Sequence, residues 1–272
     1  MTIKSSIKDF YKKMIFNLSK NTPSVYKLVY KLFYNPKPGT LEYFANRFSK
    51  NNPGLTVVQV GANDGINQDP IHKFIRRDGW KGVLLEPQKN VYQAFLKPLH
   101  ANAPDVHTLN AALSHKDGQQ PIYRIAFSSE RWATGLTSFR KEVLEEAIDT
   151  GHVARCAKKS GIPLPENKED YITEDIIEAV SPKTLLNRYD IKQIDWLQID
   201  TEGFDFEVIK MFDIAVSKPR VIVFEHSHLS VSELAACNEH LKKHEYRYSQ
   251  FGGNTLAIHA SETDYMEFFA RF

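Results

Sequence analysis

VVQVGANDG, residues 57–65, joins a short apolar run to a turn that two glycines flank. Its three valines are β-branched and predict a buried strand. Gly61 and Gly65 bracket a tight turn that opens into a helix. A strand that ends in this way brings bare backbone to the carboxyl edge of a sheet, which is where open α/β sheets bind nucleotides.

Helix and strand patterns alternate from residue 41 onward. Continuous apolar runs are typical of parallel strands that are covered on both faces. The order of the patterns predicts a Rossmann-like, doubly wound α/β fold. The expected helices cover residues 41–50, 68–78 and 89–100, and the expected strands cover residues 56–60, 82–87, 105–113, 120–126, 196–200 and 220–226.

Two further strand patterns, residues 246–251 and 255–260, flank a glycine-rich turn and predict a hairpin. An antiparallel strand at the end of an otherwise parallel sheet is unusual in dinucleotide dehydrogenases and usual in methyltransferases. We therefore expect a mostly parallel sheet over residues 41–272, with an antiparallel C-terminal hairpin.

Residues 127–175 interrupt the alternation with a polar helical stretch and a proline-containing segment. Connections of this length are uncommon unless they carry a function of their own. We expect an insertion on the substrate side of the sheet that acts as a lid. A loop that only decorates the fold is the alternative.

The composition is that of an ordinary globular chain. Its 272 residues suffice for one large domain, and 35 basic against 33 acidic residues leave a net charge of +2, too small to indicate a nucleic-acid partner. Cys156 and Cys237 show no metal-ligand spacing, and no N-terminal apolar run reaches the length of a membrane span. These features favour a cytoplasmic protein that is neither secreted nor membrane-spanning.

Basic charge is concentrated at the N-terminus. Residues 1–38 contain eight lysines and one aspartate, a net charge of +7, which leaves about −5 for the rest of the chain. Apolar residues recur at helical intervals over residues 3–34, and Pro23 marks the start of a second helix. We expect residues 1–40 to form a basic, amphipathic helical appendage. It either packs on the domain or on a second subunit, as in a homodimer, or touches the inner face of an anionic membrane.

Glu86 ends the strand that follows the glycine turn and lies 25 residues after Gly61. A carboxylate in this position can accept the hydrogen bonds of a ribose diol. The turn lacks the Gly-x-Gly-x-x-Gly pattern of pyrophosphate sites, since Asn63 stands where the middle glycine would be. Asp64 would repel a pyrophosphate but suits an ammonium group, although Asn63 and Asp64 also fit a helix cap. These features favour S-adenosylmethionine, which has no phosphate.

Acidic and imidazole groups follow the two later strands. Asp200 lies at the tip of one, and Glu225, His226 and His228 end the other. Because parallel strands end at the same edge, these side chains are expected to converge beside the ligand. We predict that Asp200, Glu225 or His226 is the general base, with His228 further back. An alternative is that Asp200, Glu225 and His226 bind Mg²⁺ or Mn²⁺.

With these residues in place, the chain resembles the FkbM-type S-adenosylmethionine-dependent methyltransferases. The resemblance spans about residues 55–260, and its most specific element is Asp-x-Glu-Gly at residues 200–203. The matching stretches are VVQVGANDG at 57–65, GVLLEP at 82–87, NAALS at 110–114, LQIDTEGFDFEVI at 197–209, VIVFEH at 221–226 and FGGNTLA at 251–257.

The resemblance implies a class I methyltransferase domain with a mostly parallel, seven-stranded sheet. It further implies methylation of a hydroxyl of a sugar or glycoconjugate, in surface polysaccharide or glycosylated natural-product biosynthesis. Two alternatives are a nicotinamide-dependent sugar dehydrogenase or epimerase, and a non-catalytic binding module of a glycan-assembly complex. The residues expected to contact S-adenosylmethionine are Gly61, Ala62, Asn63, Asp64 and Gly65 at its methionine half, Glu86 at the ribose, Ala111 or Ala112 at the adenine, and Asp200 at the sulfonium.

Overall fold

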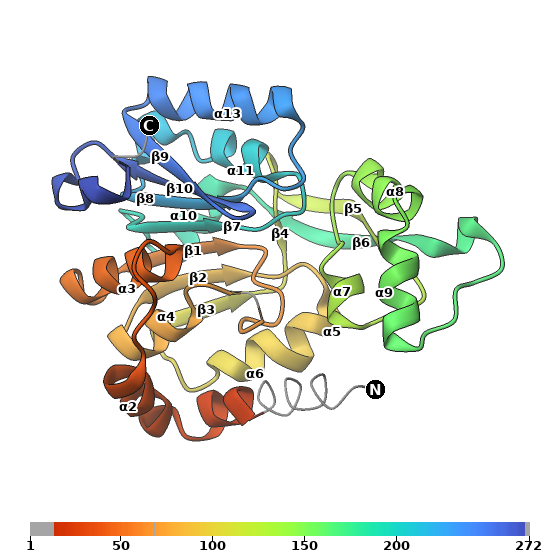
Figure 1. Cartoon of the computed structure of the whole chain (residues 1–272), viewed down its shortest axis with the longest axis horizontal. Coiled ribbons are helices and arrows are strands. Elements are labelled where there is room, and N and C mark those ends of the chain that lie inside the picture. The colour runs from red at the N-terminus through yellow and green to blue at the C-terminus, as the bar shows by residue number, and fades with distance from the viewer. Residues whose placement is uncertain (1–13, 68, 270–272) are drawn as a thin grey trace.

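A seven-stranded sheet with helices on both faces forms the centre of the computed structural model, which describes residues 14–67 and 69–269 (Figure 1). β10 is antiparallel to both of its neighbours, and the other strand pairs of this sheet are parallel. The expected mostly parallel, seven-stranded sheet with an antiparallel C-terminal hairpin is confirmed. In spatial order the strands are β3 (Val106–Leu109), β2 (Lys81–Leu85), β1 (Thr56–Val60), β7 (Trp196–Ile199), β8 (Val221–Glu225), β10 (Asn254–His259) and β9 (Tyr246–Phe251).

Alternate residues of each central strand pack into different helix layers. In β1, Val57 belongs to one hydrophobic core, whereas Val58 and Val60 belong to another on the opposite face. Burial on both faces explains why this strand is a continuous apolar run. The first layer contains α3 (Leu41–Asn51) and α4 (His72–Asp78), and the second contains α10 (Pro182–Arg188), α11 (Asp205–Met211), α12 (Ile214–Ser217) and α13 (Val231–Lys243). The helix expected over 89–100 consists of α5 (Lys89–Val91), the π-helical turn η1 (Tyr92–Leu96) and α6 (Lys97–His100).

A second, three-stranded sheet carries the insertion. The strand expected at 120–126 lies in this sheet and not in the central one, and its partner β6 was not predicted. Pro121 has no N–H to donate and therefore suits an edge strand, which is the place that β5 occupies. The sheet consists of β4 (Ala112–Leu113), β6 (Ile172–Val180) and β5 (Gly118–Ile125), and between β5 and β6 lie α7 (Arg131–Thr134), α8 (Lys141–Asp149), α9 (His152–Ser160) and η2 (Lys168–Tyr171).

The N-terminal appendage is helical where the structure describes it. Residues 14–21 form a helix, and α2 (Pro23–Phe33) begins at the expected proline. The apolar and basic residues expected on the first helical face at positions 3–13 lie outside the described residues. Within residues 14–67 and 69–269, no helix combines the length and the apolar character that crossing a membrane requires.

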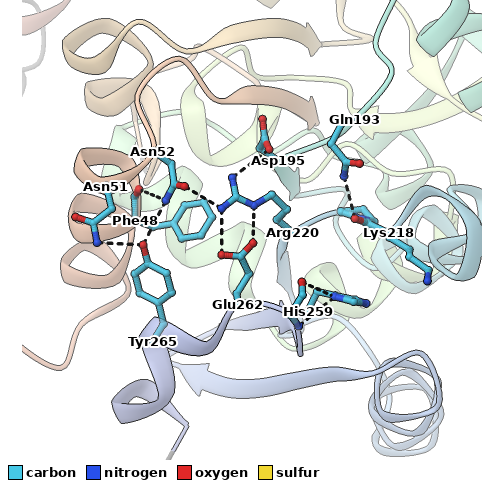
Figure 2. Close-up of polar contacts among 12 residues, drawn as sticks. Phe48, Asn51, Asn52, Gln193, Asp195, Lys218, Arg220, His259, Glu262 and Tyr265 are labelled. Carbon is cyan, nitrogen blue, oxygen red and sulfur yellow. Dashed lines mark hydrogen bonds and ion pairs between the residues drawn. The ribbon is translucent and has the colours of Figure 1, made fainter.

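Arg220 directly precedes β8 and joins three segments of the chain (Figure 2). Its guanidinium donates to both carboxylate oxygens of Glu262, at 2.6 and 3.0 Å, and to Asp195 Oδ1 at 3.3 Å. It also donates to Asn52 Oδ1 at 2.8 Å and lies 5.1 Å from the centre of the Phe48 ring. These contacts connect α3 and β8 to the chain just before η3 (Thr263–Phe268).

Replacing Arg220 by alanine should lower the free energy of unfolding by about 1–3 kcal/mol, because two half-buried carboxylates lose their shared donor. Arg220→Lys should recover only part of this stability, since lysine keeps the charge but loses the fork of donors. Urea unfolding followed by circular dichroism measures both changes. Arg188→Ala, at an exposed position in α10, is the matched control, and an Arg220→Ala protein as stable as this control would contradict the assignment.

Candidate functional site

The register of the parallel strands aligns the first residues after them. Val60 pairs with Leu85 on one side and with Ile199 on the other. Gly61, Glu86 and Asp200, which follow these three residues, therefore lie side by side. The strand order reverses direction between β1 and β7, so this row occupies the crevice at which doubly wound sheets bind ligands.

Gly61 is required by the closeness of the neighbouring strand. It has φ +82°, and a Cβ added to it would lie 1.8 Å from the carbonyl oxygen of Asp200. The N–H groups of Gly61 and Ala62 both donate to the carbonyl oxygen of Leu85, at 3.2 and 2.8 Å. Only glycine allows the chain to turn here while it stays bonded to β2.

Glu86 holds the glycine turn against the end of β2. Its carboxylate accepts hydrogen bonds from the backbone N–H of Asn63 at 2.8 Å and of Gln88 at 2.9 Å. Burial raises the pKa of Glu86 to about 7, and these hydrogen bonds oppose that increase. A carboxylate has about four acceptor positions, so Glu86 retains capacity for a ligand.

A narrow cavity lies above this row. Its wall is formed by the ends of the central strands, by the chain around β4 and by the start of the insertion. Thr137 Oγ1 and Arg131 Nε lie in this wall and are buried without a hydrogen-bond partner among residues 14–67 and 69–269, which is the state expected of groups that bind a polar ligand. Of the residues expected to contact the cofactor, those that line the cavity are Gly61, Asn63, Glu86, Ala111, Ala112 and Asp200.

Asp64 and Gly65 line neither this cavity nor the adjacent cleft. Asp64 Oδ1 accepts hydrogen bonds from the backbone N–H of Ile66 at 3.0 Å and of Asn67 at 2.7 Å. Gly65 has φ +74°, and a Cβ there would lie 2.9 Å from the Leu99 side chain. Both residues shape the turn, and Asp64 is not a helix cap as the alternative expected, because α4 begins only at His72.

A wider cleft of about 870 Å³ adjoins the narrow cavity, and Ala62 lines it. Asp200 and Glu202 line both spaces, so they stand where the two meet. The insertion supplies the other wall of the cleft, including Trp132, whose Nε1 is buried without a hydrogen-bond partner. Two ligands bound in the two spaces would face each other at Asp200.

Acidic side chains crowd this junction. Burial, followed by repulsion from Glu202 and Glu225, raises the pKa of Asp200 well above its ordinary value. Burial and repulsion from Glu202 likewise raise the pKa of Glu225 to about 7. Asp205 is fully buried and accepts hydrogen bonds from Thr201 Oγ1 at 2.9 Å and from the Glu225 N–H at 3.2 Å. Asp205 therefore fixes the turn after β7 to the end of β8.

His228 supplies the positive charge of the cluster. Its Nε2 lies 2.9 Å from Glu202 Oε2 and 4.0 Å from Glu225 Oε2. The hydrogen bond to Glu202 raises the pKa of His228 to about 9. Glu202, Glu225 and His228 each offer a ligand atom within 4.8 Å of the others, so the residues that could hold a metal ion differ from the expected Asp200, Glu225 and His226. His228 is in contact with the cluster and not further back.

His226 points away from the cluster. Its Nδ1 lies 2.9 Å from Thr255 Oγ1 of β10, and its N–H donates to the Gly253 carbonyl at 2.8 Å. The strand pairing thus continues one residue beyond Glu225, and side chains alternate along an extended chain. The expected convergence of His226 with Glu225 is therefore wrong. The turn that follows brings His228 to the acidic cluster instead.

Glu202 lies in this cluster and is a candidate functional residue that the sequence patterns did not indicate. The available signal was the Asp-x-Glu-Gly element, whose Glu202 adopts φ +50° and whose Gly203 adopts φ +94°. Positive φ is uncommon for a residue other than glycine and is associated with constrained sites. A Cβ on Gly203 would lie 3.2 Å from the His228 carbonyl oxygen, so this tight turn brings Glu202 to His228.

The insertion is hydrogen-bonded to the loops of the central sheet. The Thr134 carbonyl oxygen accepts from Asn63 Nδ2 at 3.3 Å and from Gln88 Nε2 at 2.9 Å. Ser138 Oγ donates to the Glu202 carbonyl oxygen at 2.8 Å. The first part of the insertion therefore forms part of the wall of the narrow cavity, and its role as a lid stays a prediction.

His228 should remain protonated at neutral pH, because its pKa is raised from 6.5 to about 9. The stability that this pair contributes is fully present below about pH 6.5 and is lost as the pH rises through about 9. Side-chain NMR titration should give a midpoint near 9 for His228, and Glu202→Gln should lower it. Glu207→Gln, at a more exposed position on α11, should leave it unchanged, and a midpoint near 6.5 in the unsubstituted protein would contradict the assignment.

Comparison with known proteins identifies the family. No curated protein matches the chain. The solved methyltransferase FkbM from Methylobacillus flagellatus KT is similar with a TM-score of 0.45 and 12% identity, over 76% of this chain and 44% of that one, so the chain spans less than half of that protein. Precorrin-6y C5,15-methyltransferase from Geobacter metallireducens GS-15 is similar with a TM-score of 0.38 and 14% identity, over 84% of this chain and 93% of that one. Residues 59–248, more than half of the chain, match the methyltransferase FkbM domain, and the chain therefore belongs to the FkbM methyltransferase family.

Proposed function

We propose that this protein transfers the methyl group of S-adenosylmethionine to a hydroxyl group of a sugar. The observation that carries the proposal is the position of Asp200 and Glu202 where two cavities meet. Methyl transfer needs a donor and an acceptor that face each other in line, and adjoining cavities with a shared wall suit this need. Family membership favours methyl transfer over a nicotinamide-dependent dehydrogenase or a non-catalytic module.

The narrow cavity is the proposed site of the donor. Glu86 would bind the ribose hydroxyls, and Ala111 or Ala112 would leave room for the adenine ring. Thr137 Oγ1 and Arg131 Nε would bind polar groups of the donor, since neither has a partner in the described residues. When bound, S-adenosylmethionine supplies an electrophilic methyl group on a positive sulfur. The carboxylate of Asp200 suits such a charge.

Asp200 is the proposed general base. The acceptor hydroxyl must give up its proton as its oxygen bonds to the methyl carbon, and Asp200 would take that proton. The neighbouring carboxylates and burial raise its pKa, which makes it a stronger base than an exposed aspartate. Protonated His228 offsets part of the surrounding negative charge and is therefore a poor base itself.

The wider cleft is the proposed acceptor site. Its volume of about 870 Å³ leaves room for a sugar attached to a larger molecule. Trp132 offers an apolar ring and an unpartnered indole N–H, and such amphipathic groups bind sugars through both C–H faces and hydroxyls. These features support an acceptor in a surface polysaccharide or a glycosylated natural product.

Activation of the acceptor by Mg²⁺ or Mn²⁺ is the second mechanism that the cluster permits. Glu202, Glu225 and His228 would be the ligands. The cation would have to displace the proton of His228, because only neutral imidazole binds metal. Activity that survives exhaustive chelation would exclude this mechanism, and activity that returns only with Mn²⁺ or Mg²⁺ would favour it.

Isothermal calorimetry should detect binding of S-adenosylhomocysteine and none of NAD. Glu86→Gln should weaken that binding about ten-fold or more, because a neutral amide accepts the ribose hydrogen bonds less strongly. Glu42→Gln, in the first turn of α3, is the matched control, because Glu42 lines neither of these two cavities. Equal affinities of the two variants would remove Glu86 from the donor site.

Mass spectrometry of surface glycans from cells with and without the protein tests the acceptor. Without it, one glycan should lose about 14 mass units, one methylene per missing methyl group. Wild type and Glu207→Gln should restore that mass. Asp200→Asn should not, because loss of a general base slows transfer by about 10²–10⁴-fold. Glycans of identical mass in all strains would contradict a role in this class of molecule.

A further inference from the structure

The helix α2 packs one side on the domain through tyrosines. Tyr26 is almost completely buried and stacks on Tyr30 at a ring distance of 4.4 Å. Its ring also meets His72 edge-on at 5.5 Å, and Tyr34 meets Phe74 in the same way at 5.9 Å. The side of α2 that faces α4 therefore has its apolar partners.

A second apolar surface covers the outer side of the same helix. Its members are 37% to 77% exposed. They recur at spacings of three and four residues, which places them on one continuous face. Scattered exposed apolar residues are normal in a soluble domain, whereas a continuous stripe marks a contact surface. We call this surface the outer stripe, and it consists of Val25, Leu28, Val29, Leu32 and Phe33.

Basic charge lies beside the outer stripe. Lys27 and Lys31 follow each other by one helical turn, and α2 contains no acidic residue. Residues 1–38 as a whole carry eight lysines and one aspartate, whereas the rest of the chain is net negative. An apolar stripe with lysines along one side is complementary to a surface that carries negative charge above an apolar layer.

We infer that the outer stripe of α2 binds the surface of an anionic lipid bilayer. Leu32 and Phe33 would enter the boundary between headgroups and acyl chains, while Lys27 and Lys31 would pair with lipid phosphates. A second copy of the chain fits this surface less well, because a symmetric contact would bring together two segments 14–38, each with four lysines and no acidic residue.

The position of α2 leaves the candidate site free. In Figure 1, α2 lies at the opposite end of the long axis from α8 and α9, which border the wider cleft. No residue of α2 lines the wider cleft or the narrow cavity. This inference does not depend on the identity of the methyl donor or acceptor.

Co-sedimentation of the full chain with vesicles tests the inference. The vesicles are phosphatidylcholine alone, or phosphatidylcholine with about one third phosphatidylserine. The wild type should bind the second kind at least about ten-fold more tightly, and binding should weaken as salt is added. Lys27→Gln with Lys31→Gln should reduce affinity by about 30-fold, and Leu32→Ser with Phe33→Ser by about ten-fold or more.

The matched control removes apolar surface elsewhere. Val216 and Val231 are 78% and 90% exposed and lie on α12 and α13. Val216→Ser with Val231→Ser should bind vesicles as the wild type does, and unchanged thermal midpoints show that all variants remain folded. Sedimentation that is equal for the two kinds of vesicle, or unaffected by the α2 substitutions, would overturn the inference. A dimer in ultracentrifugation that Leu32→Ser with Phe33→Ser dissociates would also overturn it in favour of a second copy.

Discussion

Parallel hydrogen bonding among β2, β1, β7 and β8 sets the position of every strand-end group in the site. The pairs Val60–Leu85, Val60–Ile199 and Ile199–Phe224 fix the register, and the residue that follows each of these paired positions is carried to one line. A shift of one residue in any of these pairs would move a carboxylate away from that line. The two apolar cores hold the register, because both faces of these strands are buried.

This alignment brings several carboxylates close together, which is electrostatically unfavourable. The repulsion is offset in a different way for each group. Asp205 accepts hydrogen bonds from its own turn, and Glu202 is paired with His228. The pKa values of Asp200 and Glu225 are raised. Like charges that share a poorly solvated edge destabilise a fold, and such clusters are concentrated where chemistry is done. The same crowding that disfavours the ionised form of Asp200 makes it a better proton acceptor.

The insertion completes the wall of the candidate site, and the N-terminal helix α2 carries the outer stripe. The insertion closes the narrow cavity through Thr134 and Ser138, which bond to three loops of the sheet edge. The N-terminal helix α2 lies at the far end and carries apolar residues on both sides. The candidate site and the outer stripe of α2 thus lie in different parts of the molecule.

Sequence patterns were sufficient for features that depend on neighbours along the chain. Apolar runs identified the strands of the central sheet, and the positions directly after them pointed to Gly61, Glu86 and Asp200, because burial and strand ends leave a local pattern. Pairing across the fold leaves no such pattern. The contact between Glu202 and His228, the turning away of His226 towards Thr255, the second sheet of β5 with β6 and the outward face of α2 arise from contacts between residues distant in the chain. Tertiary structure alone decides these features, since their partners meet only when the strands are in register.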